Sequence, residues 1–134
     1  GWTDVFLFFF FFIRRKYRTR PGFGTANLCR MGEALTGAGL KDPLIMAPFS
    51  AAGFHMNPSQ PACETAVRSQ KFTLLAMNIL ASGSVPPDRA FEYVSQFPDI
   101  RNFVIGATSE AHLSQNAALF KKYIAAPVEG SSRS

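Results

Sequence analysis

The sequence predicts an α/β fold built from parallel strand–helix units, and two observations support this. Four short apolar runs, at residues 5–13, 43–48, 72–78 and 102–106, are each followed by a segment with helical spacing of apolar residues. The runs begin about 30 residues apart, which is the length of one strand–helix unit. Alternating strands and helices favour a parallel sheet with right-handed crossovers.

The first apolar run, residues 5–13, is interpreted as a central strand of that sheet. It is too short to cross a hydrocarbon core, which needs about 20 residues in a helix. Its positive charges follow the run, whereas those of a signal peptide precede it. A short run that is apolar on both sides fits a strand buried on both faces. We therefore expect no membrane association.

Four helices are expected after these strands. The first begins after Thr25, places Leu28, Met31 and Leu35 on one face, and is stopped by glycines at 37 and 39. The second lies at 61–70, and the third runs from the Pro86-Pro87 pair to Pro98.

The fourth helix is expected at residues 109–124. Its inward stripe is predicted from side chains spaced four, three and four residues apart, namely Leu113, Ala117, Phe120 and Ile124. The polar tail at 127–134 is expected to be flexible. Residues 1–126 are therefore expected to form one folded unit.

Four strand–helix units suit either a small open sheet or half of a (β/α)8 barrel. Two details favour the half-barrel. The chain begins with Gly1 and its first predicted strand follows almost at once. A Phe-rich strand at the edge of an open sheet would also promote aggregation unless another segment covered it. We therefore expect the C-terminal half of a TIM barrel.

Charge and cysteine content narrow the classes of function. Five of the 14 basic residues lie within 14–20, and the remaining nine equal the nine acidic ones. One local patch is unlike the charged face of a nucleic-acid-binding protein, so no nucleic-acid partner is expected. Cys29 and Cys63 are too few for a disulfide framework and lack metal-ligand spacing. They indicate a cytoplasmic protein with reduced thiols and no metal site.

Ligands of parallel α/β folds bind at the loops that follow the strands. In the last loop Gly106 and Ala107 allow close approach of a ligand, while Thr108 or Ser109 can cap the next helix, whose N–H groups attract anions. The preceding loop would lie beside it and contributes Ser82, Gly83 and Ser84. Ordinary helix caps and an ordinary turn explain these residues equally well.

Other polar residues are candidate contacts to a small anionic or phosphorylated substrate: Arg18, Arg20, His55, Asn57 and Asn78. The arginines equally fit a solvated surface, His55 a structural hydrogen bond and Asn78 a loop cap. The sequence contains no nucleophile motif, dinucleotide fingerprint or zinc-protease motif. Catalytic residues are therefore not predicted, and enzymatic activity is left open.

The stretch 72–124 resembles the last two units of aldo/keto reductase-like barrels. The motifs that carry the resemblance are Ala76-Met77, Leu80-Ala81-Ser82-Gly83, the helix 87–93, the loop 104–108 and Gln115-Asn116. The upstream segments 18–28 and 53–58 resemble an uncharacterised branch of TIM-barrel proteins. Together these segments extend over about 110 residues, and their order carries more weight than any one motif.

The resemblance implies a place for NADP. In the reductases the final loop and helix hold the adenosine phosphate, which would put Gly106, Thr108 and Ser109 at the phosphate and Asn116 at the adenine. His112 stands where the family often has an arginine for the 2′-phosphate. The reductases' catalytic Asp, Tyr, Lys and His come from strands that have no counterpart in this chain.

The leading hypothesis is an anion- or nucleotide-binding half of a reductase-like barrel that is inactive alone. A second hypothesis is a non-catalytic module that forms a homodimer through its exposed strand edges. A third is a truncated fragment without a function of its own. Substrate and oligomeric state are not predicted.

Overall fold

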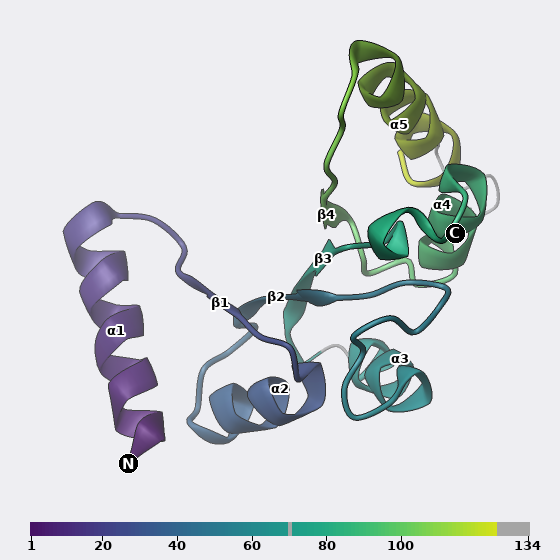
Figure 1. Ribbon diagram of the computed structural model, residues 1–134. Coiled ribbons are helices and arrows are strands. Elements are labelled where there is room, and N and C mark those ends of the chain that lie inside the picture. The colour runs from purple at the N-terminus through teal and green to yellow at the C-terminus, as the bar shows by residue number, and fades with distance from the viewer. Residues whose placement is uncertain (70, 126–134) are drawn as a thin grey trace, which may run out of the picture.

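A computed structural model describes residues 1–69 and 71–125 (Figure 1). It contains a four-stranded, all-parallel sheet in the order β1-β2-β3-β4. The strands are β1 (Gly22–Gly24), β2 (Leu44–Pro48), β3 (Thr73–Met77) and β4 (Asn102–Val104). The predicted α/β class with parallel strand–helix units is confirmed, and the last three predicted strands lie where the sequence placed them.

The described part of the chain also contains five α-helices. They are α1 (Trp2–Tyr17), α2 (Leu28–Gly37), α3 (Gln60–Arg68), α4 (Pro87–Ser95) and α5 (Glu110–Tyr123), with a short 3-10 turn η1 (Ala81–Gly83). The four helices predicted after the strands are confirmed as α2 to α5. The predicted flexible tail, 127–134, lies outside the described residues.

The prediction of a strand at residues 5–13 is wrong, because these residues lie inside α1. Asp4 is in the first turn of this helix, and Arg14, Arg15 and Lys16 are in its last turn, so the charges complement the helix dipole. The first strand is instead Gly22–Gly24, which has no apolar run by which to detect it. None of the described helices has the length and hydrophobicity that a bilayer-spanning segment requires.

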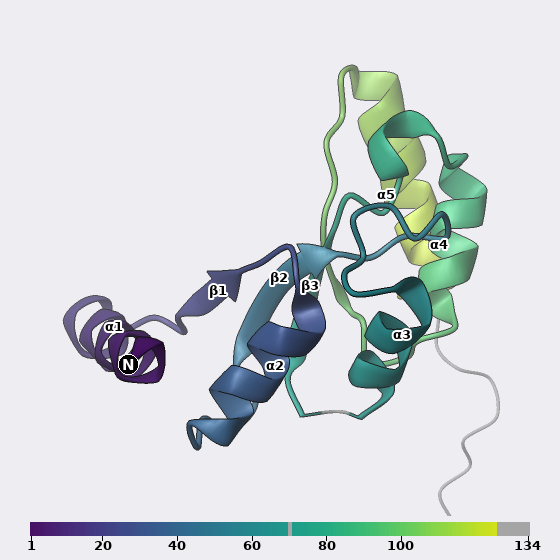
Figure 2. The same cartoon turned by 60° about the horizontal axis from the view of Figure 1, so that its bottom comes forward.

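Helix α1 lies beyond β1, at the opposite end of the sheet from α4 and α5 (Figure 2). It contacts the sheet through the ring of Phe23, whose centroid is 5.4 Å from that of Phe6, 6.2 Å from Phe9 and 6.5 Å from Phe10. The edge strand is therefore a three-residue Gly-Phe-Gly segment, and the Phe-rich sheet edge expected from the sequence does not form.

One face of the sheet is covered and the other is partly open. Phe23, Ile45 and Leu74 occupy one row across β1, β2 and β3, and all three side chains are buried. The alternate residues Leu44, Met46, Leu75 and Met77 are only half-buried. Because parallel crossovers are right-handed, a sheet that grows in one direction along the chain carries its crossover helices on one face.

The covering helices α2 and α3 each begin at a residue whose side chain caps the first turn. The Asn27 side chain accepts a hydrogen bond from the backbone N–H of Arg30 at the start of α2, and Ser59 caps α3 in the same way. In Figure 1, α2 and α3 lie side by side below the strands, while α4 and α5 pair at the other end of the sheet.

The predicted inward stripe of α5 is confirmed at two of its four positions, because Phe120 and Ile124 are half-buried and pack against the core. Leu113 is 61% exposed and Ala117 is also exposed, whereas Asn116 and Leu119 are buried. The helix is rotated so that its Tyr123 hydroxyl donates to the Asp88 carboxylate of α4, at 3.2 Å. Helical spacing predicted the period correctly, but the first half of α5 buries Asn116 and Leu119 instead of Leu113 and Ala117.

Candidate functional site

The loops after β3 and β4 meet at the carboxyl end of the sheet, where they form two adjacent hollows. The hollows have volumes of about 480 and 600 Å³. Both are lined by Leu80, Gly83, Gly106 and Thr108, so they form one continuous recess. Eight of the residues predicted to bind an anion or cofactor line it: Ser82, Gly83, Ser84, Gly106, Ala107, Thr108, His112 and Asn116.

The β3 side of the recess is a tight loop held by its own backbone. Asn78, Ala81 and Ser82 have left-handed backbone conformations, with φ of 55°, 47° and 55°. The Asn78 side-chain oxygen accepts a hydrogen bond from the Ser82 N–H at 2.9 Å, which fixes this conformation. Asn78 also lines the larger hollow. It therefore caps the loop and borders the recess at the same time.

The β4 side of the recess leads into the first turn of α5. Ser109 caps this helix by accepting the His112 N–H at 3.1 Å. The Thr108 hydroxyl lies 2.9 Å from Nδ1 of His112. Glu110 adds a carboxylate to the same turn. The turn therefore presents helix N–H groups and an imidazole with one acidic neighbour.

Gly106 leaves the centre of the recess open. A Cβ atom added at this position would have no atom within 4 Å. Packing within the protein therefore does not require glycine here, and the missing side chain leaves space that a ligand could occupy.

Asn116 contributes a polar group to the wall of the smaller hollow. It is only 8% exposed, and its side chain makes no hydrogen bond to any of the described residues. Among the described residues no fully enclosed side-chain N or O atom lacks a hydrogen-bond partner, so the amide atoms of Asn116 keep access to the open space beside them. The Asn116 amide is therefore positioned to bond a group within the recess.

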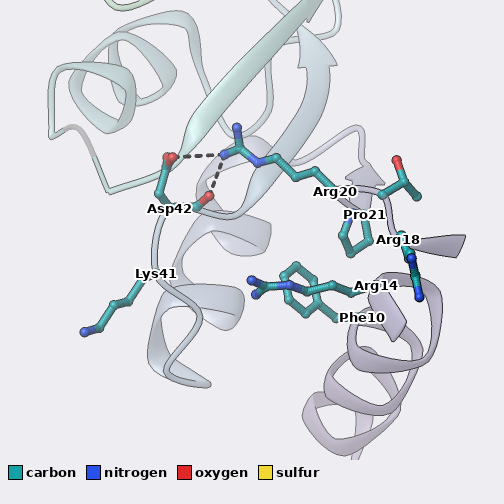
Figure 3. A pocket seen from close by; sticks show the side chains of 8 residues that line it. Phe10, Arg14, Arg18, Arg20, Pro21, Lys41 and Asp42 are labelled. Carbon is teal, nitrogen blue, oxygen red and sulfur yellow. Dashed lines mark hydrogen bonds and ion pairs between the residues drawn. The ribbon is translucent and has the colours of Figure 1, made fainter. Parts of the chain in front are cut away.

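The predicted substrate contacts Arg18 and Arg20 lie at the opposite edge of the sheet. Residues 14–20 precede β1, so they connect a helix to a strand at the amino end, and the expected strand-to-helix loop does not exist. Arg20 donates to the Asp42 carboxylate at 2.9 Å (Figure 3) and to the Thr73 hydroxyl at 3.1 Å. These partners stand immediately before β2 and at the first residue of β3.

His55 and Asn57 lie in the loop after β2, at the carboxyl end of the sheet, but they do not line the recess. The Asn57 amide donates to the backbone oxygen of Ala26 at 3.1 Å and ties this loop to the one after β1. His55 is exposed, and its ring lies 4.0 Å from that of Phe54. The hydrogen bond of Asn57 therefore has a structural role, because it joins two loops of the protein.

Sequence reasoning missed several residues of the recess. Leu80, Pro86, Pro87 and Gln115 complete its wall. The pairing of Thr108 with His112 was also missed, although their four-residue spacing at a helix start was a readable signal.

Other reactive groups in the described chain lie apart from the recess. Cys29 and Cys63 are free thiols, and burial raises the pKa of Cys63 to about 12. The Tyr93 hydroxyl donates to Glu64 at 2.7 Å and accepts from Gln60 at 3.1 Å. No group of three or more metal-ligating side chains occurs among the described residues.

Comparison with protein-family models, with curated proteins and with solved structures gave no match for this chain. The resemblance to the reductases therefore stays a prediction from sequence motifs.

Proposed function

We propose that the chain is the phosphate-binding, C-terminal half of a (β/α)8 barrel, and that the recess after β3 and β4 binds the phosphate of a nucleotide such as NADP. The observation that carries the proposal is the meeting of two separate loops at one recess. Ser82 to Ser84 come from one loop and Gly106 to His112 from the other, as ligand binding at strand ends requires.

The topology of the sheet supports the barrel part of this proposal. A (β/α)8 barrel adds its strands in chain order and keeps every helix on the outside. The sheet here has the order β1-β2-β3-β4, one covered face and one partly open face. Val104, in the edge strand β4, is 48% exposed. The remaining strands of a barrel would cover this face and continue from the β4 edge, since α1 lies beyond β1.

The polar groups of the recess support the ligand part. The first turn of α5 offers unpaired backbone N–H groups, which favour a phosphate oxygen. The amide of Asn116 lies nearby with both donor and acceptor capacity. His112 can add a hydrogen bond or a positive charge. No catalytic role is proposed for this chain, because the reductase-like catalytic residues have no counterpart in it.

Titration of the isotopically labelled full chain with NADPH, and separately with inorganic phosphate, tests the proposal by amide NMR. We expect shifts that saturate at residues 106–112 and 82–84, with weaker binding in Gly106→Val and His112→Ala. Gly37→Val is the matched control, because an added Cβ there also meets no atom within 4 Å and lies far from the recess. Absence of saturable shifts at these residues would refute the proposal.

A second candidate function is self-association through the open sheet face. The half-buried side chains of β2 and β3 and the exposed Val104 favour it. Size-exclusion chromatography with light scattering, with and without NADPH, separates the two candidates. A dimer indicates that two copies cover each other's open face, whereas a compact monomer excludes this function.

A further inference from the structure

From Val5 to Ile13, helix α1 is apolar around its whole circumference. One side, with Phe6, Leu7 and Phe10, packs against the protein. The outward side also carries large apolar residues, and Trp2 at 79% and Phe8 at 73% are the most exposed of them. The full exposed set is Trp2, Val5, Phe8, Phe9, Phe11 and Phe12. A surface helix normally has one apolar stripe, so this outward side requires a second apolar environment.

The exposed aromatic side of α1 ends in positive charge. Phe8 and Phe12 stack with their centroids 6.1 Å apart, and the ammonium group of Lys16 lies 5.2 Å from the centre of the Phe12 ring. Arg14 and Arg15 share the last turn with Lys16, while Asp4, the acid of this helix, is at the other end. Aromatic and basic side chains therefore form one continuous surface.

A basic hollow of about 530 Å³ adjoins this end of the helix (Figure 3). Arg14, Arg18 and Lys41 line it without an ion pair to any described residue, whereas Arg20 is neutralised by Asp42. The hollow therefore holds three positive charges that remain available to an anionic group.

We propose that α1 docks the protein onto a lipid bilayer that contains anionic headgroups. The exposed aromatic side chains would enter the boundary between headgroups and acyl chains, while the basic end and the adjacent hollow bind lipid phosphates. A helix lying in the membrane plane needs apolar and basic surface together, and it need not span the bilayer. Lys and Arg stems can extend along the apolar region and keep their charges at the headgroups.

Charge favours lipid over the other possible occupants. The same face of a second copy would bring the same cluster of positive residues, and Asp42, the acid that lines the hollow, is already paired with Arg20. Strands that complete a barrel would join the β4 edge and the open face of the sheet, whereas α1 packs on Phe23 of the covered face. The expectation of no membrane association depended on a buried strand at 5–13, which does not form.

Trp2 provides a direct probe, because it is the one tryptophan of the chain and lies on the proposed surface. The full chain is mixed with vesicles of phosphatidylcholine alone or of phosphatidylcholine with phosphatidylserine. We expect a blue shift of Trp2 emission and co-sedimentation with the mixed vesicles, both weakened by salt. Brominated acyl chains should quench the emission.

Two pairs of variants separate the apolar and basic contributions. Phe8→Ser with Phe12→Ser, and Arg15→Gln with Lys16→Gln, should each weaken vesicle binding by about tenfold or more. The matched controls are Leu113→Ser, an exposed apolar residue of α5, and Arg89→Gln with Arg101→Gln, which remove the same charge elsewhere. Far-UV circular dichroism checks that each variant folds, and the charge variants leave every apolar contact of α1 intact.

Three results would overturn the proposal: no co-sedimentation with the mixed vesicles, equal binding by the charge variants and wild type, or a lipid-independent dimer that already shifts Trp2 emission. The last result would identify a second copy as the occupant. The nucleotide proposal would be unaffected, since its residues lie at the other end of the sheet.

Discussion

Tyr93 joins two helices through two side-chain hydrogen bonds. Its hydroxyl, on α4, contacts Glu64 and Gln60 of α3, and its ring stacks against Phe49 with centroids 5.6 Å apart. Burial raises the pKa of Tyr93 above its ordinary value of 10.0, and the bond to Glu64 acts in the same direction. The protonated hydroxyl is therefore part of the folded state.

Tyr93→Phe should lower the free energy of unfolding by about 1 kcal/mol at neutral pH, because Glu64 and Gln60 lose a common partner. The wild-type contribution is fully present below pH 10 and declines as the pH rises toward the higher folded pKa. Urea unfolding at a series of pH values should therefore show the two proteins converging above pH 10. Tyr17→Phe, at an exposed position, is the control, and an equal loss there would contradict this assignment.

At the scale of the element, α2 ends in a hydrogen-bonded stop that depends on one glycine. The Gly39 N–H bonds to the Thr36 oxygen and the Leu40 N–H to the Leu35 oxygen, at 3.0 and 3.2 Å. Gly39 has φ of 85°, whereas Gly37 is an ordinary helical residue. The two glycines differ only in the backbone conformation that each must adopt.

Alanine at these two glycines should have opposite effects on stability. Gly39→Ala places a Cβ in the left-handed region and should destabilise the fold by about 1 kcal/mol. Gly37→Ala should stabilise it by about 0.5 kcal/mol, because alanine loses less backbone entropy in a helix. Thermal unfolding of both variants measures the difference. A stabilising Gly39→Ala would show that the left-handed stop does not form.

The sequence was sufficient for elements that combine a periodic pattern with local signals. Residues 43–48 carry a compact apolar run, and α2 has an apolar face at Leu28, Met31 and Leu35 with a glycine stop, so both were placed correctly. The run at 5–13 was assigned wrongly because a short, continuously apolar segment fits a helix or a strand equally well. The prediction of Arg18 and Arg20 at the wrong end of the sheet follows from that error. In a parallel sheet a loop that follows a strand lies at the carboxyl end, whereas a loop that follows a helix leads into the amino end of the next strand.

The residues of the recess were more predictable from the sequence than the positions of the other candidate residues. Its residues follow directly from two correctly placed strands, and parallel strands bring their following loops to one edge. The rotation of α5 and the burial of Asn116 depend on contacts with α4, which no local pattern encodes.

At the scale of the whole molecule, Phe23 joins α1 to the remainder of the fold. Three phenylalanines of α1 contact this one ring, and α1 has few other contacts. The attachment of α1 is therefore concentrated in one side chain of a short strand.

Phe23→Ala should cost about 3 kcal/mol of unfolding free energy and release α1 before the rest of the chain unfolds. Hydrogen exchange should show faster exchange of α1 amides and little change in α3 and α4. Phe54→Ala, which truncates an exposed phenylalanine, is the control. Uniform acceleration throughout the chain would show instead that α1 and the sheet unfold as one unit.

The strict order of the strands has a consequence for synthesis on the ribosome. Each strand pairs with the one made immediately before it, so no strand waits for a distant partner to be translated. Nascent β1 and β2 can associate while β3 is still in the exit tunnel, and each later unit adds to a surface already in place. The growing edge is exposed throughout elongation, which makes the newest strand the one most in need of chaperone protection.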